Sequence, residues 1–257
     1  MKLNYRKSGE GKPLFILHGL FGLSDNWASL GKVFSEHYEV FLIDLRNHGS
    51  SPHSSEWTYT VMAQDIKELI EDTIPHSKIN LMGHSLGGKT AMQFASMYPE
   101  KLDALIVVDM APKEYPGNQF PFIDKLLKID LSILKSRKEA EGELNKIIRD
   151  WATIQLLLKN IQWNEHEKLE WKFNLKIIAE QQDQIGKTFQ LNTLPITIPT
   201  LFVRGEKSNY VKDEDEDQIK KLFPNSKLIT IMGAGHWVHA DKPTEFAQCI
   251  DDFLSNK

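Results

Sequence analysis

The sequence has almost no cysteine, no long apolar run and no excess of basic residues, and each shortage excludes a class of protein. Cys249 is the single cysteine among 257 residues, so no internal disulfide can form. No apolar run reaches the roughly 18 residues of a membrane span, and the first seven residues lack the apolar stretch of a signal peptide. The formal net charge of −4 argues against nucleic acid as a partner. We therefore expect a cytoplasmic protein without a membrane span, either a monomer or a small homo-oligomer.

The order of apolar runs predicts an α/β fold with a mostly parallel central sheet flanked by helices. The chain is long enough for one large domain, and its 41% hydrophobic and 26% charged residues are ordinary for a globular protein. An edge strand is expected within residues 1–9, and helical periods are expected at 59–73 and 243–254, with a helix starting near 212–217. Short continuous apolar runs predict buried strands at 13–17, 40–45, 79–82, 102–109, 200–205 and 227–232.

The alternation of strands and helices stops between residues 111 and 198. This segment holds helix-like runs at 120–129, 136–149 and 151–161, and it is rich in large apolar residues. We expect a core made of residues 1–110 and 199–257, with a helical insertion at 111–198.

The stretch around Ser85 has the pattern of a nucleophile elbow. An apolar strand runs into Gly83, Ser85 follows two residues later, and Gly87 stands two residues beyond it, at the start of a helix. A sharp strand-to-helix turn lifts the serine hydroxyl clear of the backbone, and glycine fits where the chain passes close to itself. The same letters, residues 83–90, also match a phosphate-binding loop with Lys89 as its lysine, and a plain glycine-rich turn is the third interpretation.

Two further glycine-rich loops follow predicted strands. Residues 18–22 come after the strand at 13–17, and residues 233–236 come after the last predicted strand and end in His236. Parallel sheets hold their sites at such strand ends. His236 can act as the base for Ser85, a role that the phosphate-loop interpretation leaves unfilled. The acid is less certain: Asp109 ends one strand, while Glu206 follows another, where Ser208 holds the position that a carboxylate usually takes.

The chain resembles the YbfF-type esterases of the α/β-hydrolase superfamily along nearly its whole length. The motifs that carry the resemblance lie at residues 18–22, 44–49, 83–89 and 233–243. The resemblance implies hydrolysis of carboxylic acyl esters of short to medium chain length, with acyl thioesters as a further substrate class, and a helical cap over the pocket. It also implies that the acid is the earlier aspartate, Asp109.

The expected chemistry is acyl transfer through an acyl-serine intermediate, with no cofactor and no metal. Ser85 is the nucleophile, His236 the base and Asp109 the acid, with Glu206 as the alternative acid. The backbone N–H groups of Leu86 and of Leu20, or else Phe21, are expected to bind the oxyanion.

Other functions stay open at this level. They are a non-catalytic ligand-binding protein on a hydrolase fold, a nucleotide hydrolase, and a cofactor-free haloperoxidase or carbon–carbon hydrolase. Lys89 is expected in a structural salt bridge, His239 in packing rather than metal binding, and Asp44, Arg46 and His48 as braces of a loop beside the site.

Overall fold

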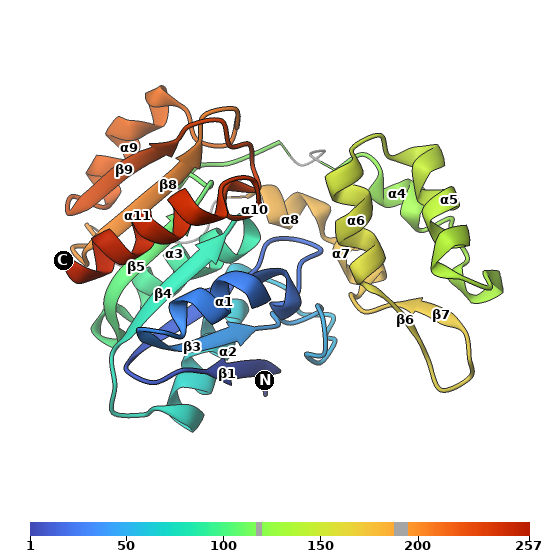
Figure 1. Cartoon of the computed structure of the whole chain (residues 1–257), viewed down its shortest axis with the longest axis horizontal. Helices are drawn as coiled ribbons and strands as arrows, with labels where there is room; N and C mark the ends of the chain where they lie inside the picture. The colour runs from blue at the N-terminus through green and yellow to red at the C-terminus, as the bar shows by residue number, and fades with distance from the viewer. Residues whose placement is uncertain (117–119, 188–194) are drawn as a thin grey trace.

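A seven-stranded sheet forms the centre of the computed structural model, which describes residues 1–116, 120–187 and 195–257 (Figure 1). Its strand order is β1-β3-β2-β4-β5-β8-β9. The edge strand β1 pairs antiparallel with β3, and the remaining pairs are parallel. The strands are β1 (Tyr5–Ser8), β2 (Lys12–Leu17), β3 (Tyr38–Ile43), β4 (Ile79–His84), β5 (Leu102–Val108), β8 (Thr200–Gly205) and β9 (Ser226–Ile231).

Helices cover both faces of the sheet, so its strands are apolar on both sides. Along β2, Phe15 and Leu17 belong to the buried cluster beneath α2, α3 and α9, while Leu14 and Ile16 belong to the cluster beneath α1 and α11. This double burial explains why the sequence shows continuous apolar runs instead of alternation. The helices of the core are α1 (Ala28–Phe34), α2 (Tyr59–Thr73), α3 (Leu86–Met97), α9 (Glu216–Leu222), α10 (Val238–Asp241) and α11 (Pro243–Ser255). Short 3₁₀ turns occupy Ser24–Trp27, Pro99–Lys101, Leu131–Ile133 and Asp213–Asp215.

The predicted strands and the two predicted long helices are confirmed, with small shifts at their ends. The strand expected at 40–45 runs two residues earlier, as Tyr38–Ile43, because its pairing with β2 begins at Tyr38. Helix α1 has no counterpart in the sequence prediction. It is seven residues long and contains Gly31, where a β-carbon would lie 2.9 Å from the side chain of Leu42. A short helix with a central glycine carries little helical signal.

The segment between β5 and β8, here called the inserted segment, contains a small sheet as well as helices. The helix predicted over 120–129 is reduced to four residues, and the one predicted over 151–161 ends at Lys159, after which an antiparallel hairpin follows. Each hairpin strand has three residues, too few to show a period of two. The elements of the segment are α4 (Ile123–Leu126), α5 (Arg137–Ile147), α6 (Trp151–Lys159), β6 (Ile161–Trp163), β7 (Leu169–Trp171), α7 (Leu175–Glu180) and α8 (Gln182–Gly186).

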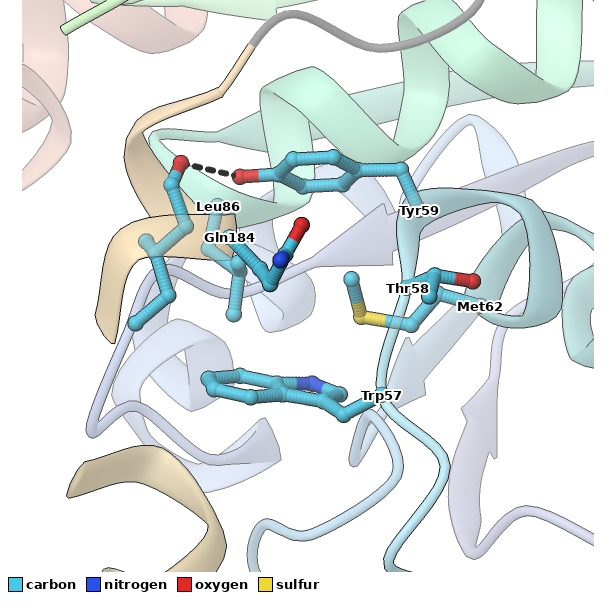
Figure 2. Close-up of a pocket in the computed structure, with 7 residues that line it drawn as sticks. Trp57, Thr58, Tyr59, Met62, Leu86 and Gln184 are labelled. Atoms are coloured by element: carbon cyan, nitrogen blue, oxygen red, sulfur yellow. Dashed lines mark hydrogen bonds between the residues drawn. The ribbon is translucent and has the colours of Figure 1, made fainter. Parts of the chain in front are cut away.

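Two side chains of the core, those of Tyr59 and Lys89, form hydrogen bonds with the C-terminal end of α8. The Tyr59 hydroxyl, at the start of α2, donates to the carbonyl of Ile185 at 2.7 Å, and Trp57, Met62 and Leu86 line the small apolar pocket below this bond (Figure 2). The buried ammonium of Lys89 donates to the carbonyls of Gly186 at 2.9 Å and Lys187 at 2.8 Å. The salt bridge expected for Lys89 is therefore wrong: backbone carbonyls take the place of a carboxylate.

Candidate active site

Ser85 stands alone between a strand and a helix in a strained conformation. It follows β4, precedes α3, and has φ +52° and ψ −114°. A β-carbon on Gly83 would lie 2.1 Å from the carbonyl oxygen of Gly87, and one on Gly87 would lie 2.6 Å from the carbonyl oxygen of His18. Both positions therefore require glycine. Backbone strain of this kind gathers at functional sites, which supports the elbow interpretation.

The phosphate-loop interpretation does not fit this geometry. Helix α3 begins directly after Ser85, and Lys89 lies within its second turn, where its backbone N–H donates to the carbonyl of Ser85 at 3.0 Å. The Lys89 ammonium binds the carbonyls of residues 186 and 187, so it points into the seam with α8 instead of a loop that could hold phosphate.

Asp109 and His236 lie in contact at the ends of β5 and β9. His236 Nδ1 is 2.7 Å from Asp109 Oδ2. Asp109 is fully buried, has φ +48°, and accepts a hydrogen bond from Gly205 N at 3.1 Å on its other oxygen. The Ser208 hydroxyl also donates to Asp109 Oδ2. These donors hold the carboxylate of Asp109 in a fixed orientation.

Glu206 lies on the same loop as Ser208 but contacts a different group. Its Oε2 accepts a hydrogen bond from Gly233 N at 2.8 Å, and the residue is exposed. The structure thus brings Asp109, and not Glu206, to the imidazole of His236. Ser208, which stands where a carboxylate was looked for, binds the carboxylate that comes from β5.

Two neighbours of His236 were not anticipated from the sequence. The ring of Tyr210 stacks on the imidazole with centroids 3.9 Å apart and planes at 17°. His84, the residue before the serine, places Nε2 2.9 Å from the carbonyl oxygen of His236. Tyr210 belongs to no motif that the analysis used, and His84, although it lies within the elbow motif, contacts a residue 152 positions away, so no local signal could have identified either contact.

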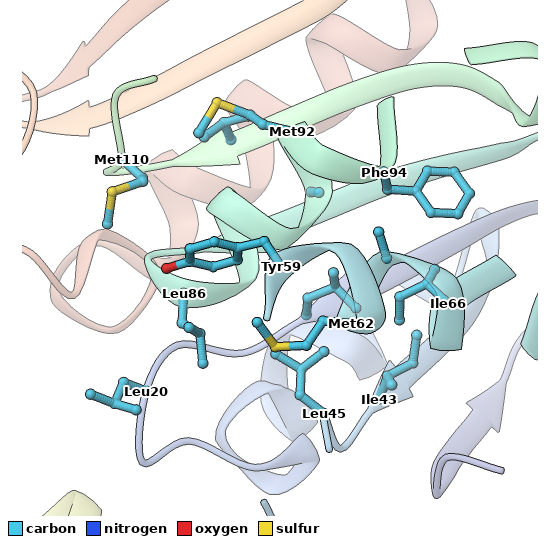
Figure 3. Packing of buried hydrophobic residues seen from close by; sticks show 14 of the residues in the cluster. Leu20, Ile43, Leu45, Tyr59, Met62, Ile66, Leu86, Met92, Phe94 and Met110 are labelled. Atoms are coloured by element: carbon cyan, nitrogen blue, oxygen red, sulfur yellow. The ribbon is translucent and has the colours of Figure 1, made fainter. Parts of the chain in front are cut away.

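The loop after β2 is held in one orientation by hydrogen bonds on the carbonyl of Gly19. This oxygen accepts from Gly22 N at 2.9 Å and lies 2.8 Å from His18 Nδ1. Because C=O and N–H point in opposite directions in a trans peptide, the N–H of Leu20 points away from those two partners. The N–H of Phe21 is already donated to His48 Nε2 at 3.3 Å. Figure 3 shows Leu20 and Leu86 with their side chains in the same buried cluster.

The polar residues expected to brace this region do so. Asp44 accepts from Ser24 N at 2.6 Å and Ser50 N at 2.9 Å, and Arg46 pairs with the buried carboxylate of Asp65 at 2.6 Å. His239 stacks on Trp27 with ring centroids 4.0 Å apart. Among the described residues, no group of three or more His, Cys, Asp or Glu side chains could hold a metal ion.

Four fully buried histidines surround the site in their neutral form. Burial lowers the pKa of His48 and of His239 to about 3, and it also lowers the pKa of His18 and His84. The hydrogen bonds agree for two of them, because His18 Nε2 accepts from Leu45 N at 3.0 Å and His48 Nε2 accepts from Phe21 N. A proton on Nε2 of His18 would point at the N–H of Leu45, and one on Nε2 of His48 would point at the N–H of Phe21. Both Nε2 atoms are therefore unprotonated.

We expect the protein to lose stability steeply as the pH falls below 6.5. The pKa of these histidines is lowered in the folded state, whereas in the unfolded chain each binds a proton near pH 6.5. The contribution of these histidines to the free energy of unfolding is therefore fully present above about pH 6.5. It falls as the pH is lowered towards 3, by at most about 1.4 kcal/mol per pH unit for each histidine. Urea unfolding at pH 7 and pH 5 and constant ionic strength measures it. Equal midpoints at the two pH values would contradict this account.

Ser85 and His236 line the same pocket at the carboxyl ends of the strands. Helix α6 contributes Thr153 and Leu156 to it, so the inserted segment forms one wall. The described residues that line the pocket include no lysine, arginine, aspartate or glutamate. They are Gly19, Leu20, Phe21, Ser85, Phe120, Phe122, Thr153, Leu156, His236 and Trp237.

Over the described ranges, the structure has no helix both long and apolar enough to cross a bilayer.

Known proteins resemble this chain in sequence and in structure. The chain is 30% identical over 262 residues to Esterase YbfF of Escherichia coli, with all of both chains covered. It is 35% identical over 252 residues to a protein of Mus musculus named sn-1-specific diacylglycerol lipase, covering 94% of this chain and 80% of that one. Among solved structures, one titled Marine microorganism esterase matches with a TM-score of 0.95 and 41% identity, covering 98% of this chain and 99% of the other.

A family model agrees with these likenesses. The model described as the alpha/beta hydrolase fold matches residues 12–139 and 151–243, which include Ser85, Asp109 and His236. The resemblance to YbfF-type esterases that the motifs indicate is confirmed over the full chain. On the combined grounds of matched residues, relatives and sheet topology, the chain belongs to the α/β-hydrolase fold family.

Proposed function

We propose that this protein is a serine hydrolase that cleaves neutral carboxylic acyl esters of short to medium chain length through an acyl-serine intermediate. The observation that carries the proposal is the 2.7 Å contact between His236 and the buried carboxylate of Asp109, in a site that shares its pocket with a strained Ser85. Relatives that carry esterase and lipase names support the same class of reaction.

The three side chains have distinct roles in this mechanism. Asp109 accepts a hydrogen bond from the Nδ1–H of His236, which leaves Nε2 as the acceptor for the Ser85 proton. The Ser85 oxygen then attacks the ester carbonyl, His236 returns the proton to the departing alcohol, and water hydrolyses the acyl-enzyme by the reverse sequence. Asp109 stays ionised throughout and stabilises the imidazolium that forms at each step.

The oxyanion is bound by two backbone N–H groups in this proposal. Leu86 supplies one from the first residue of α3, where the helix dipole also favours negative charge. Leu20 supplies the other; the alternative, Phe21, has its N–H committed to His48. Each such donor stabilises the transition state by about 2.7–4 kcal/mol.

The residues that line the pocket favour the binding of neutral acyl groups over charged ones. The rings of Phe21, Phe120 and Phe122 lie within about 6 Å of one another, with centroid separations of 5.9–6.2 Å, and no charged side chain accompanies them among the described lining residues. An ionised group that enters such a site loses its hydration without gaining a partner. We propose that the inserted segment acts as a cap whose aromatic residues select the acyl chain, with acyl thioesters as alternative substrates of the same site.

We expect an ester whose acyl chain ends in a carboxylate to be hydrolysed much more slowly than a neutral ester of similar length. The kcat/KM for p-nitrophenyl butyrate should exceed that for a p-nitrophenyl ester of similar length with a terminal carboxylate by about 100-fold or more, because the carboxylate would be buried unpaired. Steady-state kinetics on the two esters at pH 7.5 measure the ratio. A ratio near one would mean that a cation outside the described wall reaches the acyl chain.

Covalent labelling tests the proposed function directly. A fluorophosphonate probe should label the purified protein at one site without added metal, and peptide mass spectrometry should place the adduct on Ser85. Labelling together with turnover of p-nitrophenyl butyrate supports a serine esterase. Absence of both would favour the ligand-binding alternative, in which the fold is retained without catalysis.

A further inference from the structure

We propose that Asn160, at the C-terminal end of α6, is a positioning residue for the oxyanion hole: its side-chain amide holds the Leu20–Phe21 loop in the conformation that aims the Leu20 N–H at the reacting carbonyl. The proposal rests on the proposed function, and in particular on Leu20 as an oxyanion donor. It assigns the inserted segment a part in the rate of the reaction, in addition to its part in forming the pocket.

The loop needs external support because Phe21 is strained. Residues 19–22 form a turn closed by the bond from Gly22 N to the carbonyl of Gly19 at 2.9 Å. Phe21, the third residue of this turn, has φ +59°, a left-handed conformation that favours glycine and disfavours a bulky aromatic residue. A strained residue of this kind persists only where its surroundings determine its conformation more than once.

Phe21 is held on both of its peptide groups. Its N–H donates to His48 Nε2 at 3.3 Å, and its carbonyl oxygen accepts from Asn160 Nδ2 at 2.6 Å. The first bond comes from the core and the second from the inserted segment. The Phe21 ring also packs against Phe173 of that segment, with centroids 5.0 Å apart. Loss of the Asn160 bond would free the carbonyl side of Phe21 to relax, and the neighbouring Leu20 N–H would turn with it.

Asn160 is itself fixed in place. Its backbone N–H donates to Leu157 O at 2.9 Å, its carbonyl accepts from Lys172 N at 2.7 Å, and its side chain is fully buried. The side-chain nitrogen also donates to Leu156 O at 3.0 Å. In contrast, Asn160 Oδ1 has no hydrogen-bond partner among the described residues. A buried acceptor without a partner is destabilising, so the contribution of this amide to the structure comes from its two N–H donors.

The carbonyl of Phe21 thus connects the wall of the substrate pocket with the proposed oxyanion donor. Helix α6 lines the pocket through Thr153 and Leu156, and the residue that follows its last turn, Asn160, binds the loop. A displacement of about 1 Å at a catalytic group can reduce the rate by about 100-fold. The position of α6 therefore affects transition-state stabilisation as well as substrate fit.

The test compares Asn160→Asp with Asn174→Asp, a matched control. Asn174 Nδ2 also joins the inserted segment to the core, through Asn47 Oδ1 at 3.2 Å, but it does not contact the 19–22 loop. In Asn160→Asp a carboxylate oxygen faces the carbonyl of Phe21, so kcat for p-nitrophenyl butyrate should fall by about 10- to 100-fold while KM stays within about three-fold. The rate of phosphonylation by a fluorophosphonate should fall in parallel. Asn174→Asp should keep kcat within about three-fold of the unmodified protein, because the oxyanion donors are untouched.

Thermal melts separate positioning from folding. If Asn160→Asp does not fold, Asn160→Leu, which introduces no charge, decides the question by the same split between kcat and KM. A kcat within three-fold of the unmodified protein, or an equal loss in the Asn160 and Asn174 variants, would overturn the proposal. Failure of the proposed function is distinguishable, because then the unmodified protein would show no Ser85-dependent turnover at all.

Discussion

Replacing Ser85 with alanine is expected to lower kcat for p-nitrophenyl butyrate by about 10⁶-fold, to a residual rate supplied by the oxyanion hole and substrate binding alone. The elbow places Ser85 in the pocket that also holds His236, and the proposed attack on the ester carbonyl depends on the Ser85 hydroxyl. KM should change little, because the apolar wall that binds the acyl chain is untouched. Initial rates of p-nitrophenolate release, with enzyme at micromolar concentration for the variant, measure the effect.

Ser35→Ala is the control for this experiment. The Ser35 hydroxyl donates to Lys32 O at 2.8 Å at the end of α1, outside the pocket, and its removal should leave kcat unchanged. Thermal melting of the Ser85 variant should show a folded protein, since the strain at φ +52° belongs to the backbone and is kept by alanine. Turnover that survives in Ser85→Ala would mean that the elbow is not the source of the activity.

The sheet and the elbow could be predicted because their signals are local. A strand buried on both faces needs a continuous apolar run, and β2, β4 and β5 each have one. The elbow depends on steric contacts of two glycines: a β-carbon on Gly83 would overlap the carbonyl of Gly87 within the turn, and one on Gly87 would overlap the backbone of residues 17 and 18 at the end of β2. In both cases the residue pattern that indicates the feature lies in one short stretch, although the contact that requires Gly87 is made with the end of β2.

Contacts between distant segments could not be predicted in the same way. Whether Asp109 or Glu206 faces His236 depends on β5 lying between β4 and β8 in the sheet, and the sequence order does not specify strand neighbours. The bond from Asn160 to Phe21 joins residues 139 positions apart. The hairpin in the inserted segment has strands of three residues, which show no measurable period. The bond from Asn160 and the hairpin became visible only with the tertiary structure, whereas Asp109 was expected from the family resemblance and not from the order of the strands.

Replacing Asp109 with asparagine is expected to lower kcat by about 10⁴-fold while leaving the fold intact. The amide keeps the shape of the carboxylate and can still accept from Gly205 N through its oxygen. Its NH₂ group would then face His236 Nδ1, which now lies 2.7 Å from the carboxylate oxygen Oδ2 of Asp109. The imidazole would have to accept at Nδ1 and carry its proton on Nε2, so it could no longer take the proton of Ser85. Steady-state kinetics at pH 7.5 on the variant, with a thermal melt alongside, measure the loss.

Glu206→Gln is the matched control, because it removes a carboxylate from the neighbouring loop without approaching the imidazole. The Glu206 side chain accepts from Gly233 N at 2.8 Å, a bond that the amide oxygen of glutamine can keep, so kcat should stay within about two-fold. The pair of variants separates the two candidate acids by more than three orders of magnitude. A large loss in Glu206→Gln together with activity in Asp109→Asn would reverse the assignment and require the loop after β8 to move towards His236. A large loss in both would instead indicate that the carboxylate of Glu206 fixes the 233–236 turn on which His236 depends, since Gly233 N is its partner. In that case Asp109 keeps its role as the acid, and Glu206 acts on the imidazole only through the backbone.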